Sequence, residues 1–227
     1  MDEKPKGGKK EMDLRTIPRP EHPRPQMERQ HWTNLNGEWN FYIDYGDSGK
    51  DRKLYNNTEL PERIIVPFCP ESRCSGVAKT DFMPAVWYQK TLMLKKDLNR
   101  RKLLLHFDAV DYECSVWLNG EPVGEHRGGY SSFSFDITEY VREGENNLVV
   151  LARDELRCGL QPRGKQSPTY FSGGCNYTRT TGIWQTVWLE EVPESYILSL
   201  QYYPNVAENS LTIKAKVQGS GVLEARA

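Results

Sequence analysis

The sequence has no apolar stretch long enough to cross a membrane, and its mean hydropathy is low, at −0.71. A membrane-spanning helix needs about 20 consecutive apolar residues, so we expect no membrane partner. Residues 1–10 are mostly polar or charged and lack the apolar stretch that a secretory signal requires. Long helical periodicity is missing too, since no apolar pattern of helical spacing extends beyond about two turns. These absences argue against a membrane protein and against a helical fold.

An excess of charge of one sign is also missing. The 30 basic and 31 acidic residues give a formal net charge of −1, so electrostatics offers no reason to expect a nucleic-acid partner. The five cysteines, at positions 69, 74, 114, 158 and 175, are odd in number and lack metal-ligand spacing. We therefore expect reduced thiols, no metal, no cofactor and a cytoplasmic location, with a secreted form whose signal has been removed left open.

Aromatic residues, by contrast, are abundant, with 6 Trp, 12 Tyr and 7 Phe. They fall in short runs of alternating apolar and polar residues, the pattern of half-buried strands. Trp39, Phe41 and Ile43, for example, would share one face of a strand that follows the tight-turn pair Asn36-Gly37. About eight such runs, separated by Gly, Asn and Pro turns, predict an all-β sandwich or jelly roll.

Three segments depart from this rhythm. Residues 1–14 have too little apolar surface to offset the entropy cost of ordering, which predicts a disordered tail. Within the sandwich, which we expect to occupy residues 15–192, two long loops cover residues 67–84 and 154–181, and loops of this length are usually functional. Residues 193–227 resume the alternation with too few strands to bury a core, so they would begin a second β domain.

Two local expectations concern side chains outside the regular alternation. Trp117 is out of phase with Val116 and Leu118, so it should face away from their layer and pack against a neighbouring domain. Thr138 is placed to cap a short helical turn that extends through Arg142.

Several blocks of sequence that occur in one order carry a resemblance to a known family. They are the stretch from Pro18 to Trp39, VPF at residues 66–68, VWLNG at 116–120, GEHRGGY at 124–130, FDIT at 135–138 and YTRTTGIWQTVWLE at 177–190. In this order they resemble the N-terminal sugar-binding domain of family 2 glycoside hydrolases. That family includes β-galactosidases, β-glucuronidases and β-mannosidases.

The resemblance covers residues 15–192 and implies a galactose-binding-like jelly-roll sandwich, followed by the start of an immunoglobulin-like β domain. In that family a TIM barrel carries two glutamates that perform retaining hydrolysis. The acid/base glutamate of the barrel follows an asparagine, and no Asn-Glu pair occurs in this sequence. We therefore expect no catalytic residue here and leave open whether the chain alone is an enzyme.

The resemblance also indicates a loop that reaches the active site of the barrel. In many members, a carboxylate six residues before the glycine of a Gly-Ile pair contacts the terminal sugar, and the matching position, six residues before Gly182, is Asn176. An asparagine amide can donate and accept hydrogen bonds, but it lacks the charge that makes such bonds about twice as strong. Asn176, Tyr177 and Arg179 are the candidate substrate-binding residues, with bracing of the loop as the alternative role for Arg179.

Three hypotheses for function follow. The first is an accessory sugar-binding domain of a retaining β-glycoside hydrolase of carbohydrate metabolism, with a β-galactosidase-like or β-glucuronidase-like parent. Its partners would be a β-glycoside and the catalytic barrel of the same parent chain, with homo-oligomerisation left open. The second is a free-standing carbohydrate-binding module, and the third is a non-catalytic structural or interaction remnant.

Overall fold

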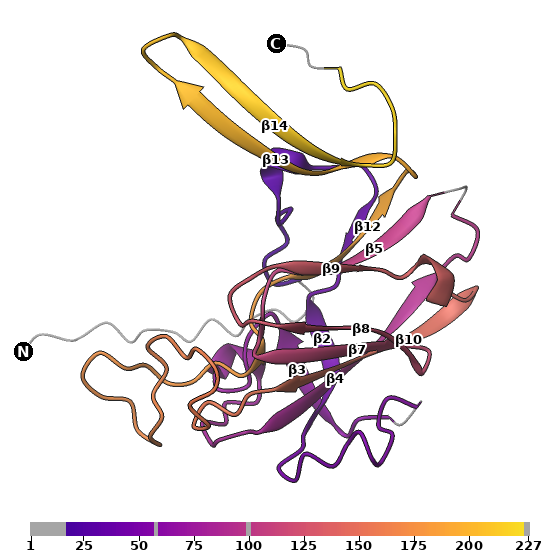
Figure 1. Cartoon of the computed structure of the whole chain (residues 1–227). Helices are drawn as coiled ribbons and strands as arrows, with labels where there is room; N and C mark the ends of the chain where they lie inside the picture. The colour runs from indigo at the N-terminus through magenta and orange to yellow at the C-terminus, as the bar shows by residue number, and fades with distance from the viewer. Residues whose placement is uncertain (1–16, 57–58, 99–100, 225–227) are drawn as a thin grey trace, which may run out of the picture.

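The computed structural model describes residues 17–56, 59–98 and 101–224 and shows two antiparallel β-sheets packed face to face (Figure 1). The all-β sandwich predicted from the sequence is confirmed. The predicted disordered tail, residues 1–14, lies outside the described residues.

The larger sheet has six strands in the order β3-β2-β4-β10-β7-β8. They are β2 (Gly37–Ile43), β3 (Glu62–Val66), β4 (Ala85–Leu94), β7 (Glu113–Leu118), β8 (Glu121–Arg127) and β10 (Gly144–Arg153). The smaller sheet has four strands in the order β1-β12-β5-β9. They are β1 (Trp32–Asn34), β5 (Lys102–Phe107), β9 (Phe133–Asp136) and β12 (Val187–Val192). The first and last strands of the sandwich, β1 and β12, pair with each other.

Shorter elements complete the architecture. The pair β6 (Val110–Asp111) and β11 (Gly182–Ile183) forms a small separate sheet, and β13 (Tyr196–Asn205) and β14 (Ser210–Gln218) form a hairpin. The described residues also form three single 3-10 turns, η1 (Pro25–Met27), η2 (Arg73–Ser75) and η3 (Thr138–Tyr140).

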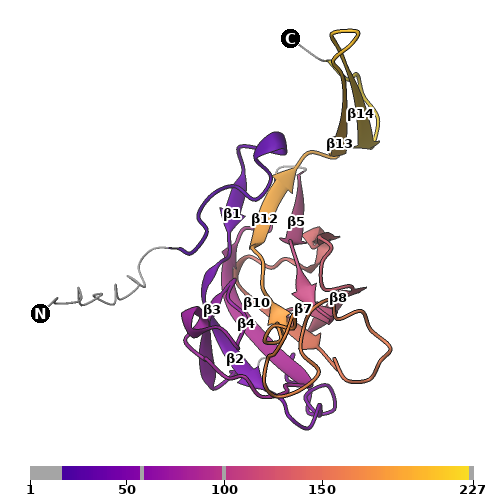
Figure 2. The ribbon, with the colours of Figure 1, turned by 90° about the vertical axis from the view of Figure 1, so that its left-hand side faces the viewer.

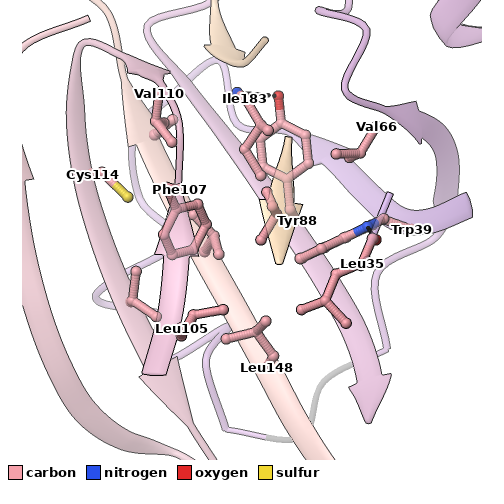
Figure 3. Close-up of a cluster of buried hydrophobic side chains, with 14 of the residues drawn as sticks. Leu35, Trp39, Val66, Tyr88, Leu105, Phe107, Val110, Cys114, Leu148 and Ile183 are labelled. Atoms are coloured by element: carbon pink, nitrogen blue, oxygen red, sulfur yellow. Dashed lines mark hydrogen bonds between the residues drawn. The ribbon is translucent and has the colours of Figure 1, made fainter. Parts of the chain in front are cut away.

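The two sheets share one apolar core (Figure 3). The predicted face of Trp39, Phe41 and Ile43 is confirmed, because all three side chains are buried in β2. From the opposite sheet, Leu105 and Phe107 of β5 enter the same layer and are fully buried. Burying an apolar side chain of this size contributes roughly 1.5–3 kcal/mol, so the alternation of each strand determines which face turns inward.

The Tyr88 hydroxyl is a polar group within this apolar layer. It accepts a hydrogen bond of 3.2 Å from the backbone N–H of Ile183 in β11 (Figure 3). Gly182 has a φ of +75°, and a Cβ added there would lie 2.3 Å from the Tyr88 hydroxyl oxygen. Only glycine fits this close approach, and the core thereby fixes the end of the segment that precedes β11.

The prediction for Trp117 is half right. Its ring faces away from the main core, but its neighbours belong to the same sandwich rather than to another domain. It stacks on Tyr55 at 5.0 Å and on Trp87 at 5.6 Å between ring centroids. The connection between β2 and β3 folds back over the outer face of the larger sheet, a tertiary contact that strand alternation does not encode.

The prediction for Thr138 is wrong in its detail. The turn η3 is a single 3-10 turn that Thr138 begins rather than caps. Its hydroxyl accepts a hydrogen bond of 2.9 Å from the N–H of Leu103 and donates one of 2.5 Å to Oδ1 of Asp136. The Thr138 side chain therefore ties the turn to β5 and β9.

The β13–β14 hairpin stands apart from the sandwich in both views (Figures 1 and 2). Its side chains Tyr202, Leu211, Ile213 and Val217 are exposed. Two strands cannot bury a core by themselves, and the hairpin leaves these side chains uncovered. The assignment of residues 193–227 to an immunoglobulin-like domain stays a prediction.

Arg29, in the segment before β1, joins the sandwich to the hairpin. Its guanidinium donates to Oε1 of Glu190 at 2.6 Å and to the carbonyl oxygen of Ile197 at 2.5 Å. The other carboxylate oxygen of Glu190 lies 3.3 Å from Nε2 of His106. Burial would raise the pKa of Glu190, but the His106 and Arg29 contacts outweigh it and lower that pKa. A buried, charged Glu190 therefore anchors the base of the hairpin.

All five cysteines are free thiols, as expected, and the cytoplasmic location stays a prediction. Within the described ranges, no helix has the length and apolarity to cross a membrane.

Replacing Tyr88 by Phe should lower the free energy of unfolding by about 1–3 kcal/mol, because the buried N–H of Ile183 would lose its acceptor. For a domain of this size, each kcal/mol corresponds to a fall in melting temperature of roughly 2–4 °C. The exposed Tyr45→Phe is the matched control and should melt like the parent. Equal melting temperatures for the two variants would show that the Tyr88 hydroxyl does not stabilise the fold.

Candidate functional site

A long segment without regular strands, residues 154–181, connects β10 to β11. Two isolated β-bridges, Gln166–Tyr177 and Gly173–Asn176, fold it back on itself. Figures 1 and 2 both place this loop at the end of the sandwich remote from the β13–β14 hairpin. We call it the 154–181 loop.

The candidate residues Asn176 and Tyr177 lie side by side on this loop. Asn176 is half-buried, and its backbone N–H donates to the carbonyl of Gly173 at 3.0 Å. The Tyr177 side chain is 63% exposed, and its backbone N–H donates to the carbonyl of Lys165 at 2.8 Å. The loop therefore presents an amide beside an aromatic ring, two groups that suit the hydroxyls and the apolar faces of a sugar.

Arg179, the third candidate, points into the protein instead and is only 3% exposed. Its guanidinium donates to the carbonyl of Thr169 at 2.8 Å and to the carbonyl of Thr80 in the 67–84 segment. It also lies 4.1 Å from the centroid of the Phe82 ring. This geometry corresponds to the bracing role that the sequence left as the alternative, and a sugar contact by Arg179 stays a prediction.

Three buried carboxylates that the sequence did not single out hold the loop: Glu71, Asp111 and the first residue of the loop, Asp154. Glu71 accepts a hydrogen bond of 3.2 Å from the N–H of Thr181, and Asp154 accepts one of 3.3 Å from the hydroxyl of the same residue. Asp111 accepts a hydrogen bond of 2.7 Å from Nε2 of Gln166. Glu71 and Asp111 thus bind the 154–181 loop from outside it, and Asp154, its first residue, binds Thr181 near its end.

Burial raises the pKa of all three carboxyls. The pKa of Asp111 rises to about 7, first because of burial and then because of the nearby Asp154 charge, against the hydrogen bond from Gln166. Burial raises the pKa of Glu71 to about 7 and that of Asp154 to about 6. These carboxyls are partly protonated near neutral pH, and their lack of exposure keeps them from touching a ligand in solution.

The described part of the chain contains no group of three or more His, Cys, Asp or Glu side chains that could hold a metal ion. The carboxylates are instead bound by amide and hydroxyl groups of the loop. Their arrangement supports anchoring of the loop.

Large apolar side chains are exposed along the outer part of the loop. Phe171 is 80% exposed and packs edge-on against Tyr170, with 5.0 Å between their centroids. Leu160 is 90% exposed. Tyr177 is a further exposed aromatic side chain of the same loop.

A family model described as "Glycosyl hydrolases family 2, sugar binding domain" matches residues 32–193. The chain belongs to this family. The sugar-binding domain named by the model ends just before the β13–β14 hairpin and includes the whole 154–181 loop.

Named relatives of this family 2 domain are larger glycosidases. The chain is 30% identical over 190 residues to a putative beta-glucuronidase of Formosa agariphila, covering 81% of this chain and 21% of that protein. It is 32% identical over 139 residues to a beta-galactosidase of Thermoanaerobacter pseudethanolicus, covering 58% of this chain and 18% of that protein. The chain therefore spans about a fifth of the length of these curated relatives.

Solved structures show the same fold. A beta-glucuronidase of Lactobacillus rhamnosus matches with a TM-score of 0.67 at 22% identity, over 85% of this chain and 34% of that one. A beta-glucuronidase of an uncultured Clostridium species matches with a TM-score of 0.64, also at 22% identity. In these proteins, as in the sequence relatives, the family 2 domain is one part of a longer chain.

Replacing Arg179 by Ala should increase cleavage of the loop by chymotrypsin after Tyr170 and Phe171. The change leaves two backbone carbonyls without their charged donor, and each such bond contributes about 1.5–3 kcal/mol. Since cleavage follows the population of the open loop, the rate should rise about tenfold or more.

The matched control is Arg157→Ala, which removes a second guanidinium 4.1 Å from the centroid of the Phe82 ring but leaves the Arg179 hydrogen bonds intact. Its cleavage rate should stay close to that of the parent. An unchanged rate in Arg179→Ala would contradict the bracing role.

Proposed function

We propose that this chain is the accessory sugar-binding domain of a retaining β-glycoside hydrolase, with a β-glucuronidase-like or β-galactosidase-like parent. In this proposal the 154–181 loop contributes Asn176 and Tyr177 to a substrate pocket. The catalytic glutamates lie in a barrel of the same parent chain, outside residues 1–227. The observation that carries the proposal is a half-buried Asn176 followed directly by the exposed Tyr177, on a loop that buried side chains hold in place.

The state of the acidic residues agrees with an accessory role. Retaining hydrolysis needs two carboxyl groups about 5 Å apart that both reach the sugar. The carboxyls with the most strongly raised pKa values are those of Glu71 and Asp111, and both are buried under the loop. Perturbed carboxyls often mark active sites, but here burial prevents contact with a glycosidic bond. The catalytic pair is therefore expected elsewhere in the parent chain.

A free-standing carbohydrate-binding module is the second candidate. The exposed rings of Tyr170, Phe171 and Tyr177 favour it, because aromatic faces can bind sugars without help from another domain. The exposed apolar side chains of the β13–β14 hairpin favour the accessory domain, since an independent module would not need them.

Hydrolysis of a panel of nitrophenyl β-glycosides separates the two candidates. The chain of 227 residues is expected to be inactive, and a version extended by the sequence that follows in its gene is expected to hydrolyse one or a few of the glycosides. Activity in the short chain would overturn the proposal. Tight binding of a free sugar by the short chain, without activity in the longer one, would favour the module.

Asn176→Ala in the extended enzyme should reduce kcat/KM about 2- to 10-fold, because a neutral hydrogen bond contributes about 0.5–1.5 kcal/mol. The melting temperature should not change, since no side-chain bond of Asn176 stabilises the described fold. The exposed Ser172→Ala on the same loop is the control and should leave kinetics unaffected. Parental kinetics in Asn176→Ala would remove this residue from the pocket.

A further inference from the structure

The Gln166 side chain joins the two arms of the 154–181 loop. Its Oε1 accepts a hydrogen bond of 2.7 Å from the N–H of Thr180, and its Nε2 donates to Oδ2 of Asp111, also at 2.7 Å. The backbone of Gln166 forms a parallel β-bridge with Tyr177. The side-chain amide holds Gln166 in place, and the bridge passes that position on to Tyr177 and to its neighbour Asn176. The positions of both candidate residues therefore depend on where the Gln166 side chain is held.

Asp111 is the fixed end of this connection. It lies in β6, paired with Gly182 of β11, and is 1% exposed. A Cβ added to Gly129 would lie 2.3 Å from Oδ1 of Asp111, so the Gly129 backbone packs directly against the carboxylate. That backbone is itself held, because the indole N–H of Trp184 donates to the carbonyl of Gly129 at 2.8 Å. The carboxylate therefore has little freedom to move.

We propose that Asp111 is a positioning residue for the 154–181 loop: through the Gln166 amide, it sets where Asn176 and Tyr177 lie. The importance of those two residues rests on the function proposed above, but the arrangement itself needs no bound sugar. Asp111 is buried, so it influences a ligand only through the loop.

The charged and titratable groups around Asp111 come from each element packed against it. Asp154, which directly follows β10, and Glu71, in the 67–84 segment, both disfavour its negative charge. The Gln166 amide from the loop favours that charge, and the Tyr130 hydroxyl lies 3.4 Å from the same amide nitrogen. The Arg179 guanidinium favours the charge of Asp154. Burial and the two carboxylates together raise the pKa of Asp111 more than the Gln166 hydrogen bond lowers it.

This balance gives the loop a defined pH dependence. The pKa of Asp111 is raised from 3.8 to about 7, so the closed loop binds the proton more tightly than the opened loop does. The stabilisation of the closed loop is complete below pH 3.8 and is lost as the pH rises through about 7. Glu71 and Asp154 act in the same direction, with pKa values of about 7 and about 6.

Hydrogen exchange of the 227-residue chain tests the proposal without any sugar. The amides of Thr180 and Tyr177 report the loop, after correction for the intrinsic effect of pH on exchange. If opening returns the pKa of Asp111 to 3.8, Asp111 alone makes the open state about 30-fold more populated at pH 8 than at pH 5.5. We expect the loop amides to lose protection accordingly, while the amides of β4 and β10 change little.

Two variants identify the residues responsible. Asp111→Asn keeps an acceptor for Gln166 but removes the titrating carboxyl. The change in loop protection between pH 5.5 and pH 8 should therefore shrink about 30-fold. Gln166→Ala removes the connection on the loop side and should lower the protection of Thr180 at both pH values. The control Asp136→Asn changes a carboxyl of β9 that pairs with Lys102 of β5, and it should leave loop protection unchanged.

Unchanged loop protection in both Asp111→Asn and Gln166→Ala would overturn the proposal. So would a parallel loss of protection in the loop and in β4 and β10, because Asp111 would then only stabilise the fold as a whole. The function of the loop is tested separately by Asn176→Ala. Parental kinetics in that variant would contradict the proposed sugar contact and leave the positioning role of Asp111 standing.

Discussion

The side chains of two antiparallel sheets interlock in one apolar layer, and the Tyr88 hydroxyl lies within it. Because water is excluded there, the hydroxyl must be paired inside the protein, and its partner is the N–H of Ile183. The bond fixes the end of the 154–181 loop against the core, while β10 fixes its beginning. The loop therefore extends from two rigid points, and its own conformation depends on what lies between them.

Between those points the loop has few backbone pairs, and side chains hold it instead. Arg179 binds carbonyls of both long segments, and Gln166 connects the loop to Asp111. Burying carboxylates costs free energy, so replacing such a group by apolar side chains can even stabilise a protein. What the polar contacts provide is a defined arrangement, since the Arg179 guanidinium and the Gln166 amide each join two separate parts of the chain. The buried carboxylates therefore define the position of the loop, but their burial lowers the free energy of unfolding.

The sequence predicts the sandwich well and the loop poorly, for one physical reason. Strand faces such as Trp39, Phe41 and Ile43 follow a local period of two, which the sequence displays directly. The covering of Trp117 by Tyr55, and the bond from Gln166 to Asp111, join residues that only the folded chain brings together. Asn176 and Tyr177 could be named through the family resemblance, whereas their anchors carry no sequence signal beyond a polar residue at the edge of an apolar run.

The amide at position 176 makes the anchoring more important. A neutral hydrogen bond between an amide and a sugar hydroxyl is about half as strong as one that the hydroxyl donates to a carboxylate, so less free energy is available to order a mobile loop during binding. A loop that is ordered beforehand avoids that entropic cost. The buried contacts of Asp111, Asp154 and Glu71 supply such order from beneath. The acidic residues with the most strongly raised pKa values are therefore buried and hold the loop, whereas the residues proposed to meet a ligand, Asn176 and Tyr177, are neutral.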